Sequence, residues 1–240
     1  MIERGYKFTI ASGRPYFLIE DILKEINLDN RKGQYTIALN GATIYQNDGK
    51  LLFEHALSFK QVDFLYELSL KYQTGFSFFL KDHLYLINPI PSELLRRKSQ
   101  KANYSIVDGL EKYRDMTIYK CLLVDDDIAK LRQIGKQHAH EFEEMKIEFS
   151  FSSNRYLECN DAGVNKGAGV LYLTEHLGLD LSKVVAIGDN SNDVPMLKVA
   201  GLGVSVANGS TDAKKSSAII LKERFDEGAV AKLIDDYFLD

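Results

Sequence analysis

The stretch Val184-Val185-Ala186-Ile187-Gly188-Asp189-Asn190-Ser191-Asn192-Asp193 decides the fold. Its apolar start, with two adjacent valines, predicts a strand buried on both faces of a parallel sheet. Two carboxylates, Asp189 and Asp193, follow where the strand ends, just before a helix that begins near Pro195. Open α/β sheets bind ligands at this end of their strands, and paired carboxylates there suit Mg²⁺. The alternative is a plain loop with an aspartate helix cap.

A second turn of this kind lies near the start of the chain. Residues 6–11 read as a strand, and Ser12-Gly13-Arg14-Pro15 follows as a tight turn. Proline suits the first turn of a helix, which we expect to run to about Ile26. A hydroxyl and a glycine beside a helix N-terminus form a plausible anion cradle, although such turns are common.

The pattern of strands and helices predicts two domains. Strands at 35–39, 184–187, 202–206 and 218–221 alternate with helices and glycine-rich turns, which indicates a doubly wound parallel sheet. Residues 44–154 lack these glycine-punctuated strand ends, although 47–50 contain a good hairpin turn. We therefore expect a discontinuous α/β core at 1–43 and 155–240, with an inserted α/β cap domain at 44–154.

Lys166 is the candidate cation of the core. It opens a predicted helix between Asn165 and Gly167, where the helix dipole disfavours positive charge. A lysine at this position is better explained if it faces an anion, and the alternative is a solvated side chain.

Composition excludes several classes. The formal net charge of −4 gives no basic field for nucleic acid. No apolar run reaches 18 residues and no signal peptide precedes the first strand, so we expect neither a membrane span nor export. Cys121 and Cys159 share no motif, and buried thiols in a reducing cytoplasm are the simplest interpretation.

These motifs together resemble the haloacid dehalogenase (HAD) superfamily. Ser12-Gly13-Arg14, Lys166-Gly167 and Gly188–Asp193 are similar to its motifs II, III and IV and occur in the same order. The chain looks most like the Cof-type phosphatases of that superfamily. Three runs carry this closer likeness, namely Asn40-Gly41-Ala42, residues 192–197 and Val206-Ala207-Asn208.

The resemblance implies a Mg²⁺-dependent phosphohydrolase of small phosphorylated metabolites, with a Rossmann-like core and a cap. By this likeness Asp189 holds Mg²⁺ with support from Asp193, and Lys166 offsets charge on the phosphoryl group. Ser12 donates a hydrogen bond to that group, and Asn192 contacts either metal-bound water or the phosphate. The substrate-binding set also includes the residues Gly13, Arg14 and Asn40. Positioning and electrostatic stabilisation are the usual route for phosphoryl transfer.

One part of the family pattern is missing. Its motif I, a strand ending in Asp-x-Asp that supplies the nucleophile, should precede Ser12, and the printed sequence has no room for it. We therefore expect residues 1–240 to be a poor phosphatase. Either the two strands that flank motif I close up, another segment or chain fills the gap, or the gene product is longer. The alternative function is a non-catalytic relative that binds a phosphorylated ligand or a protein.

Other candidates have structural explanations. Asp125-Asp126-Asp127 contains an Asp-x-Asp, but it lies in the predicted cap and more simply caps the following helix. Arg96-Arg97-Lys98 is read as a solvated face, with a substrate clamp as the alternative. The aromatic residues Phe76, Phe78, Phe79 and Tyr85 are read as cap core, with a substrate pocket as the alternative.

Overall fold

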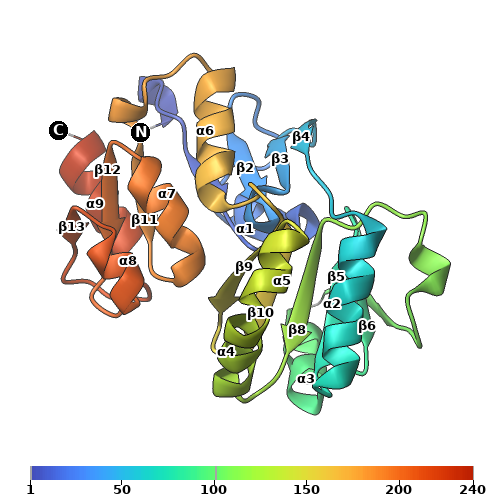
Figure 1. The fold of residues 1–240 in the computed structure, drawn as a ribbon. Coiled ribbons are helices and arrows are strands. Elements are labelled where there is room, and N and C mark those ends of the chain that lie inside the picture. Colours follow the sequence, from blue (N-terminus) through green and yellow to red (C-terminus); the bar gives the residue numbers. More distant parts are fainter. Residues whose placement is uncertain (1, 101, 240) are drawn as a thin grey trace.

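Three β-sheets organise the chain in the computed structural model, which describes residues 2–100 and 102–239 (Figure 1). Two of the sheets, with helix α6 (Lys166–His176), form the core, and the third forms the cap. The predicted α/β class with an inserted domain is confirmed. The first and last described segments lie near each other in Figure 1. Tyr6 packs edge-on against Phe238.

The first core sheet is mixed. Its strands, in spatial order, are β1 (Thr9–Ala11), β2 (Tyr35–Ala38), β3 (Thr43–Gln46) and β4 (Leu51–Glu54). β1 and β2 are parallel, whereas β3 and β4 run antiparallel to their neighbours. The expected parallel pairing is present, and the antiparallel strands β3 and β4 extend the sheet beyond β2.

The second core sheet is parallel throughout. It consists of β11 (Val185–Gly188), β12 (Leu202–Ser205) and β13 (Ile219–Ile220). The helices of the core are α1 (Glu20–Glu25), α6, α7 (Val194–Val199), α8 (Thr211–Lys215) and α9 (Ala229–Phe238). Short 3₁₀ turns occupy Ile2–Arg4, Tyr16–Leu18, Leu39–Gly41, Leu181–Lys183 and Ser191–Asp193.

Helix α6 joins the two core sheets. Its Val170 packs both against the cluster of Ile37 and Leu173 and against that of Ala186, which also includes Ala11 of β1. β1 and β11 each form an edge of their own sheet, and in residues 2–100 and 102–239 no strand pairs with either edge between them. The two strands have therefore not closed up, which contradicts the first of the three alternatives.

The cap is a six-stranded sheet with most of its helices on one face and the helix at Pro91–Ser99 on the other. Its strand order is β7-β6-β5-β8-β10-β9. The strands are β5 (Gly75–Phe79), β6 (Leu84–Ile87), β7 (Tyr104–Ile106), β8 (Lys120–Val124), β9 (Ile147–Ser152) and β10 (Tyr156–Asp161). The helices are α2 (Phe59–Lys71), α3 (Pro91–Ser99), α4 (Ile128–Gln137) and α5 (Ala139–Glu144), with a 3₁₀ turn at Glu111–Tyr113.

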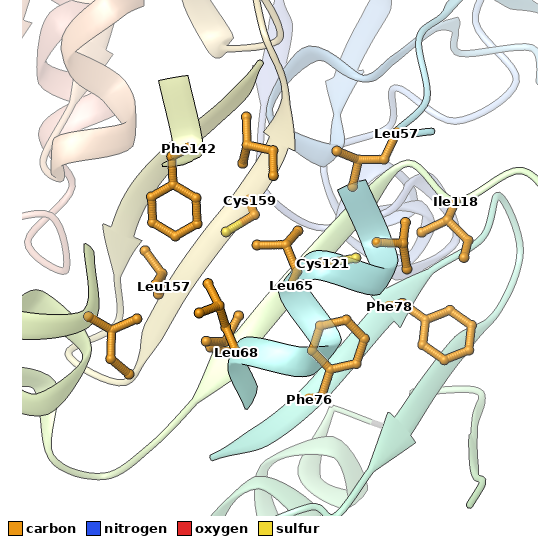
Figure 2. Close-up of a cluster of buried hydrophobic side chains, with 14 of the residues drawn as sticks. Leu57, Leu65, Leu68, Phe76, Phe78, Ile118, Cys121, Phe142, Leu157 and Cys159 are labelled. Atoms are coloured by element: carbon orange, nitrogen blue, oxygen red, sulfur yellow. The ribbon is translucent and has the colours of Figure 1, made fainter. Parts of the chain in front are cut away.

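Strand alternation gives the cap sheet two different faces. Phe76, Phe78, Cys121 and Leu157 point toward the covering helices and build the cap core (Figure 2). Phe79 points to the opposite face, which packs against Leu39, Ala42 and Val164 of the core domain. The cap-core interpretation thus holds for Phe76 and Phe78, and Tyr85 packs against that cluster.

Both predicted domain boundaries need correction. β3 and β4 pair within the first core sheet, so residues 44–54 belong to the core. β10 pairs with β8 and β9, so residues 156–161 belong to the cap sheet and not to the core. The turn at Ser153 and Asn154, both with positive φ, is the hairpin between β9 and β10 and not an interdomain linker.

In the described ranges, no helix combines the length and the hydropathy that crossing a membrane requires.

Candidate active site

A polar cavity of about 310 Å³ lies between the cap sheet and the carboxyl ends of β1 and β11. Seven of the residues singled out from the sequence line it, namely Ser12, Gly13, Arg14, Lys166, Asp189, Asn192 and Asp193. Asn40 instead lines an adjoining cavity of about 140 Å³, together with Lys166 and Asn192. The structure therefore brings together all of the motif residues that the sequence placed far apart.

Backbone hydrogen bonds fix the Ser12 turn against the end of β2. The Ser12 amide donates to Ile37 O at 2.8 Å, and the amides of Leu39 and Asn40 donate to the carbonyls of Arg14 and Ser12, both at 2.9 Å. The Ser12 hydroxyl accepts the Arg14 amide at 3.1 Å. The hydroxyl is thus held at the cavity edge and keeps its own proton for donation.

Asp193 organises the turn that follows β11. Its Oδ2 accepts the amides of Asp189 and Asn190, each at 2.9 Å. A Cβ built on Gly188 would stand 2.5 Å from the Asp193 Cβ, so only glycine allows this approach. The other oxygen, Oδ1, accepts the Lys166 ammonium. Both carboxylate oxygens of Asp193 therefore accept hydrogen bonds, and the residue stabilises the turn that contains it.

Lys166 is buried at the start of α6, where Asn165 caps the helix by accepting the Ala168 amide at 2.9 Å. The Lys166 side chain is 8% exposed and pairs with Asp193, so the solvated alternative is wrong. A Cβ on Gly167 would lie 2.7 Å from the Pro195 carbonyl, so this glycine lets α6 approach the first turn of α7. Because α6 and α7 lie this close together, the Lys166 ammonium lies at the cavity.

Asp189 is the half-buried carboxylate of the cavity. Its Oδ2 accepts the Asn190 amide nitrogen at 2.8 Å, and no cation in the described residues forms an ion pair with it. Burial and the neighbouring Asp193 charge raise the pKa of Asp189, and the Lys166 charge only partly opposes this. An additional cation beside Asp189 would favour its ionised form.

Lys120 and Glu158 are site residues that the sequence reasoning missed. They are diagonal neighbours on the paired strands β8 and β10, where Leu122 is opposite Glu158, and the Lys120 Nζ lies 2.8 Å from Glu158 Oε2. The same Nζ donates to Gly13 O at 2.9 Å and so ties the cap to the Ser12 turn. Oppositely charged residues inside two otherwise apolar strands were the available indication, since buried charges are almost always paired.

The contact with Lys120 favours the ionised form of Glu158. Burial alone would raise the pKa of Glu158, but the Lys120 charge and hydrogen bonds from Ser152 and Asn40 outweigh it and lower that pKa. Asn40 also accepts a hydrogen bond from the Asn192 amide at 3.3 Å. Asn40 therefore links Glu158 of the cap to the turn after β11.

The remaining candidates divide between the two interpretations made for them. Asp127 caps α4 by accepting the amides of Ala129 and Lys130, as predicted, and it does not line the cavity. Arg96 and Arg97 line the cavity, so they are not a solvated face. Phe79 also lines it, and at the same time it belongs to the buried cluster between the cap sheet and the core domain.

Comparisons with known proteins agree with this fold and site. The family model for haloacid dehalogenase-like hydrolases matches residues 1–234. The putative phosphatase YxeH of Bacillus subtilis is 28% identical over 98% of this chain and 87% of its own length. An HMP-PP phosphatase of Escherichia fergusonii is 30% identical over 86% of this chain and 73% of its own length.

A solved structure gives the same result. A haloacid dehalogenase-like hydrolase from Bacteroides thetaiotaomicron superposes with a TM-score of 0.83 at 26% identity, over 98% of this chain and 88% of that one. Since the family model spans nearly the whole sequence, this chain belongs to the haloacid dehalogenase-like hydrolases.

Proposed function

We propose that this chain carries the phosphate- and metal-binding residues of a Mg²⁺-dependent phosphohydrolase that acts on small phosphorylated metabolites in the cytoplasm. The observation that supports this most is the convergence of Ser12, Lys166, Asp189 and Asn192 on one cavity. A hydroxyl, an ammonium, a carboxylate and an amide are the groups that a bound phosphate and its metal require. Membership of a family whose relatives include named phosphatases supports the reaction type.

The donor set fits Mg²⁺. Asp189 offers a hard carboxylate oxygen that has no cation partner in the described part of the chain, and Asn192 lies beside it in the cavity. Asp193 would hold the turn and Lys166 rather than the metal directly, because both of its oxygens already accept hydrogen bonds. Bound Mg²⁺ would supply charge neutralisation for the transferring phosphoryl group.

The side chains of the pocket would position the phosphate ester. The Ser12 hydroxyl would donate to a phosphoryl oxygen, and the Lys166 ammonium would stabilise the charge on that group. The cap sheet covers the cavity and would limit access of water.

An attacking carboxylate is what the described pocket does not supply. Glu158 is paired with Lys120, Asp193 is paired with Lys166, and Asp189 is assigned to the metal. We therefore propose that residues 1–240 bind phosphate esters with Mg²⁺ but hydrolyse them slowly. The same observation favours the second candidate function, a relative that binds a phosphorylated ligand without turning it over.

Binding and turnover of the 240-residue chain test these proposals separately. Calorimetry with orthophosphate, with and without Mg²⁺, should give Mg²⁺-dependent binding that Lys166→Met and Asp189→Asn abolish. Lys198→Met is the matched control, because Lys198 is exposed on α7 outside the cavity. Turnover of an aryl phosphate should be slow even when Mg²⁺ is present. Orthophosphate binding that is unchanged without Mg²⁺ and in Lys166→Met would contradict the site assignment.

A further inference from the structure

The cavity contains more positive charge than its own carboxylates neutralise. Three of its five cations are ion-paired in the described residues. The pairs are Lys120 with Glu158, Lys166 with Asp193, and Arg97 with Glu93. Arg14 and Arg96 also line the cavity, and the described residues give neither of them a carboxylate partner within ion-pair distance. Two guanidinium groups are thus left to meet an anion.

Rings and cations alternate along the cap wall of the cavity. The Phe79 ring centroid lies 5.9 Å from Lys120 Nζ and 5.9 Å from Arg97 Cζ. The Tyr156 ring centroid lies 5.7 Å from Arg97 Cζ and 5.7 Å from Arg96 Cζ. The order along the wall is therefore Lys120, Phe79, Arg97, Tyr156 and Arg96.

This row has a near end and a far end relative to the Ser12 turn. The near end is Lys120, which donates to Gly13 O in that turn. The far end is Arg96, whose Nη2 lies 3.4 Å from Ser153 Oγ in the exposed hairpin turn between β9 and β10. Arg14 follows Gly13 in the Ser12 turn and lines the same cavity as Arg96, and burial together with the charges of Arg96 and Arg97 lowers its pKa.

The middle of the row is fixed by one buried carboxylate. Glu93 pairs with Arg97 at 2.6 Å and accepts the Tyr156 hydroxyl at 2.6 Å. Both partners of Glu93 are buried, so the wall is rigid before any ligand arrives. A rigid wall with an unneutralised guanidinium at its far end is arranged to recognise charge at a set distance from the phosphate.

We propose that Arg96, assisted by Arg14, forms a second anion subsite. The preferred substrate is then a small metabolite with a phosphate ester at one end and a carboxylate or second phosphate at the other. This rests on the proposed function for the position of the first phosphate. A cavity of about 310 Å³ suits a compact metabolite of this kind. Guanidinium groups bind both anions through paired hydrogen bonds.

Three ligands that differ only at the far end test the subsite. They are glycerol 3-phosphate, 3-phosphoglycerate and glycerol 1,3-bisphosphate, and their Kd values are measured by calorimetry with Mg²⁺ in 150 mM salt. We expect 3-phosphoglycerate, glycerol 1,3-bisphosphate or both to bind about 10- to 100-fold more tightly than glycerol 3-phosphate, because they carry a second anionic group. This range is that of a charge-assisted hydrogen bond. Which of the two is preferred identifies the second anion.

Variants on one helix assign the preference. Arg96→Gln should bring the Kd of glycerol 3-phosphate, divided by that of the tighter-binding ligand with a second anion, close to one. Arg96→Lys should restore part of this ratio. Lys98→Gln, an equal loss of charge at an exposed neighbour outside the cavity, should leave the ratio unchanged. Arg14→Gln, on an exposed turn, should lower the ratio without touching the cap core.

The outcomes separate the subsite from the function. Equal Kd values for all three ligands would overturn the second subsite and leave the proposed function standing. A preference that survives Arg96→Gln, or that Lys98→Gln removes equally, would also overturn it. Failure of every phosphate compound to bind would overturn both proposals.

Discussion

Replacing Glu158 with glutamine should destabilise the fold by about 3–5 kcal/mol, because it leaves the Lys120 charge buried without a partner. The two side chains are 6% and 2% exposed, and their charged atoms lie 2.8 Å apart. At that distance and an effective dielectric constant of about 20, their attraction is about 6 kcal/mol. Desolvation offsets part of the attraction in the wild type, but the variant keeps the cost of burying Lys120 and loses the gain.

Urea unfolding followed by circular dichroism measures this loss. The matched control is Lys130→Met, which breaks an ion pair of similar length, 2.7 Å, whose side chains are 34% and 17% exposed. We expect the control to lose about 1 kcal/mol or less. Lys120→Met combined with Glu158→Leu should recover much of the loss, since no charge then remains unpaired.

Unfolding of Glu158→Gln at the same urea concentration as the control would contradict a large cost of leaving Lys120 unpaired. That result would mean that water or a rearranged Lys120 solvates the charge. A double variant as unstable as Glu158→Gln would instead show that packing, and not charge, sets the loss.

Three further predictions concern titration and reactivity. Because folding lowers the pKa of Glu158, its ionised carboxylate stabilises the fold. This stabilisation is complete above pH 4.5, the ordinary pKa of a glutamate, and is lost as the pH falls through the lowered pKa. The difference in free energy of unfolding between wild type and Glu158→Gln should therefore become smaller below about pH 4.5. A difference that grows in acid would contradict a lowered pKa for Glu158. The raised pKa of Asp189 means that its ionised form opposes folding at pH 7, so Asp189→Asn should raise Tm in EDTA but lose the rise that Mg²⁺ gives the wild type. Cys121 and Cys159 are buried with raised pKa values, so both should resist Ellman's reagent until the chain unfolds, and fast labelling of either native thiol would disagree.

The core site was predictable because its residues obey local rules. A parallel strand followed by Asp189 and Asp193 indicates a ligand-binding edge, and a lysine at a helix start indicates a nearby anion. Strand β11 is buried at alternate residues only, and not on both faces as predicted, because it forms the edge of its sheet. Each inference needs only a few neighbouring residues. The structure brings these local features together at one cavity, since the carboxyl ends of β1 and β11 meet there.

The domain boundaries could not be read in the same way. The β9–β10 hairpin turns at Ser153 and Asn154, both with positive φ, without the glycine that normally marks such a turn. The sequence reading therefore took a hairpin for a linker. Strand β10 alternates between Leu157, which faces the cap core, and Glu158, which faces the cavity. Which partner strand pairs with it depends on long-range contacts that local patterns do not encode.

The far wall of the cavity was also hidden from the sequence. Arg96, Phe79 and Tyr156 come from a helix and two strands that are distant in sequence, and each has an ordinary structural explanation by itself. Only their spacing around shared rings indicates a function.

The bond from Lys120 to Gly13 affects how a ligand enters and leaves. Swinging the cap away would break this bond together with those from Asn40 to Glu158 and from Asn160 to Leu39 O, all of them buried or partly buried. At about 1 kcal/mol for each bond, the closed arrangement is the resting state and wide opening is rare. A ligand would then enter and leave at the rim near Ser153, so a bulkier side chain at this position should slow ligand exchange.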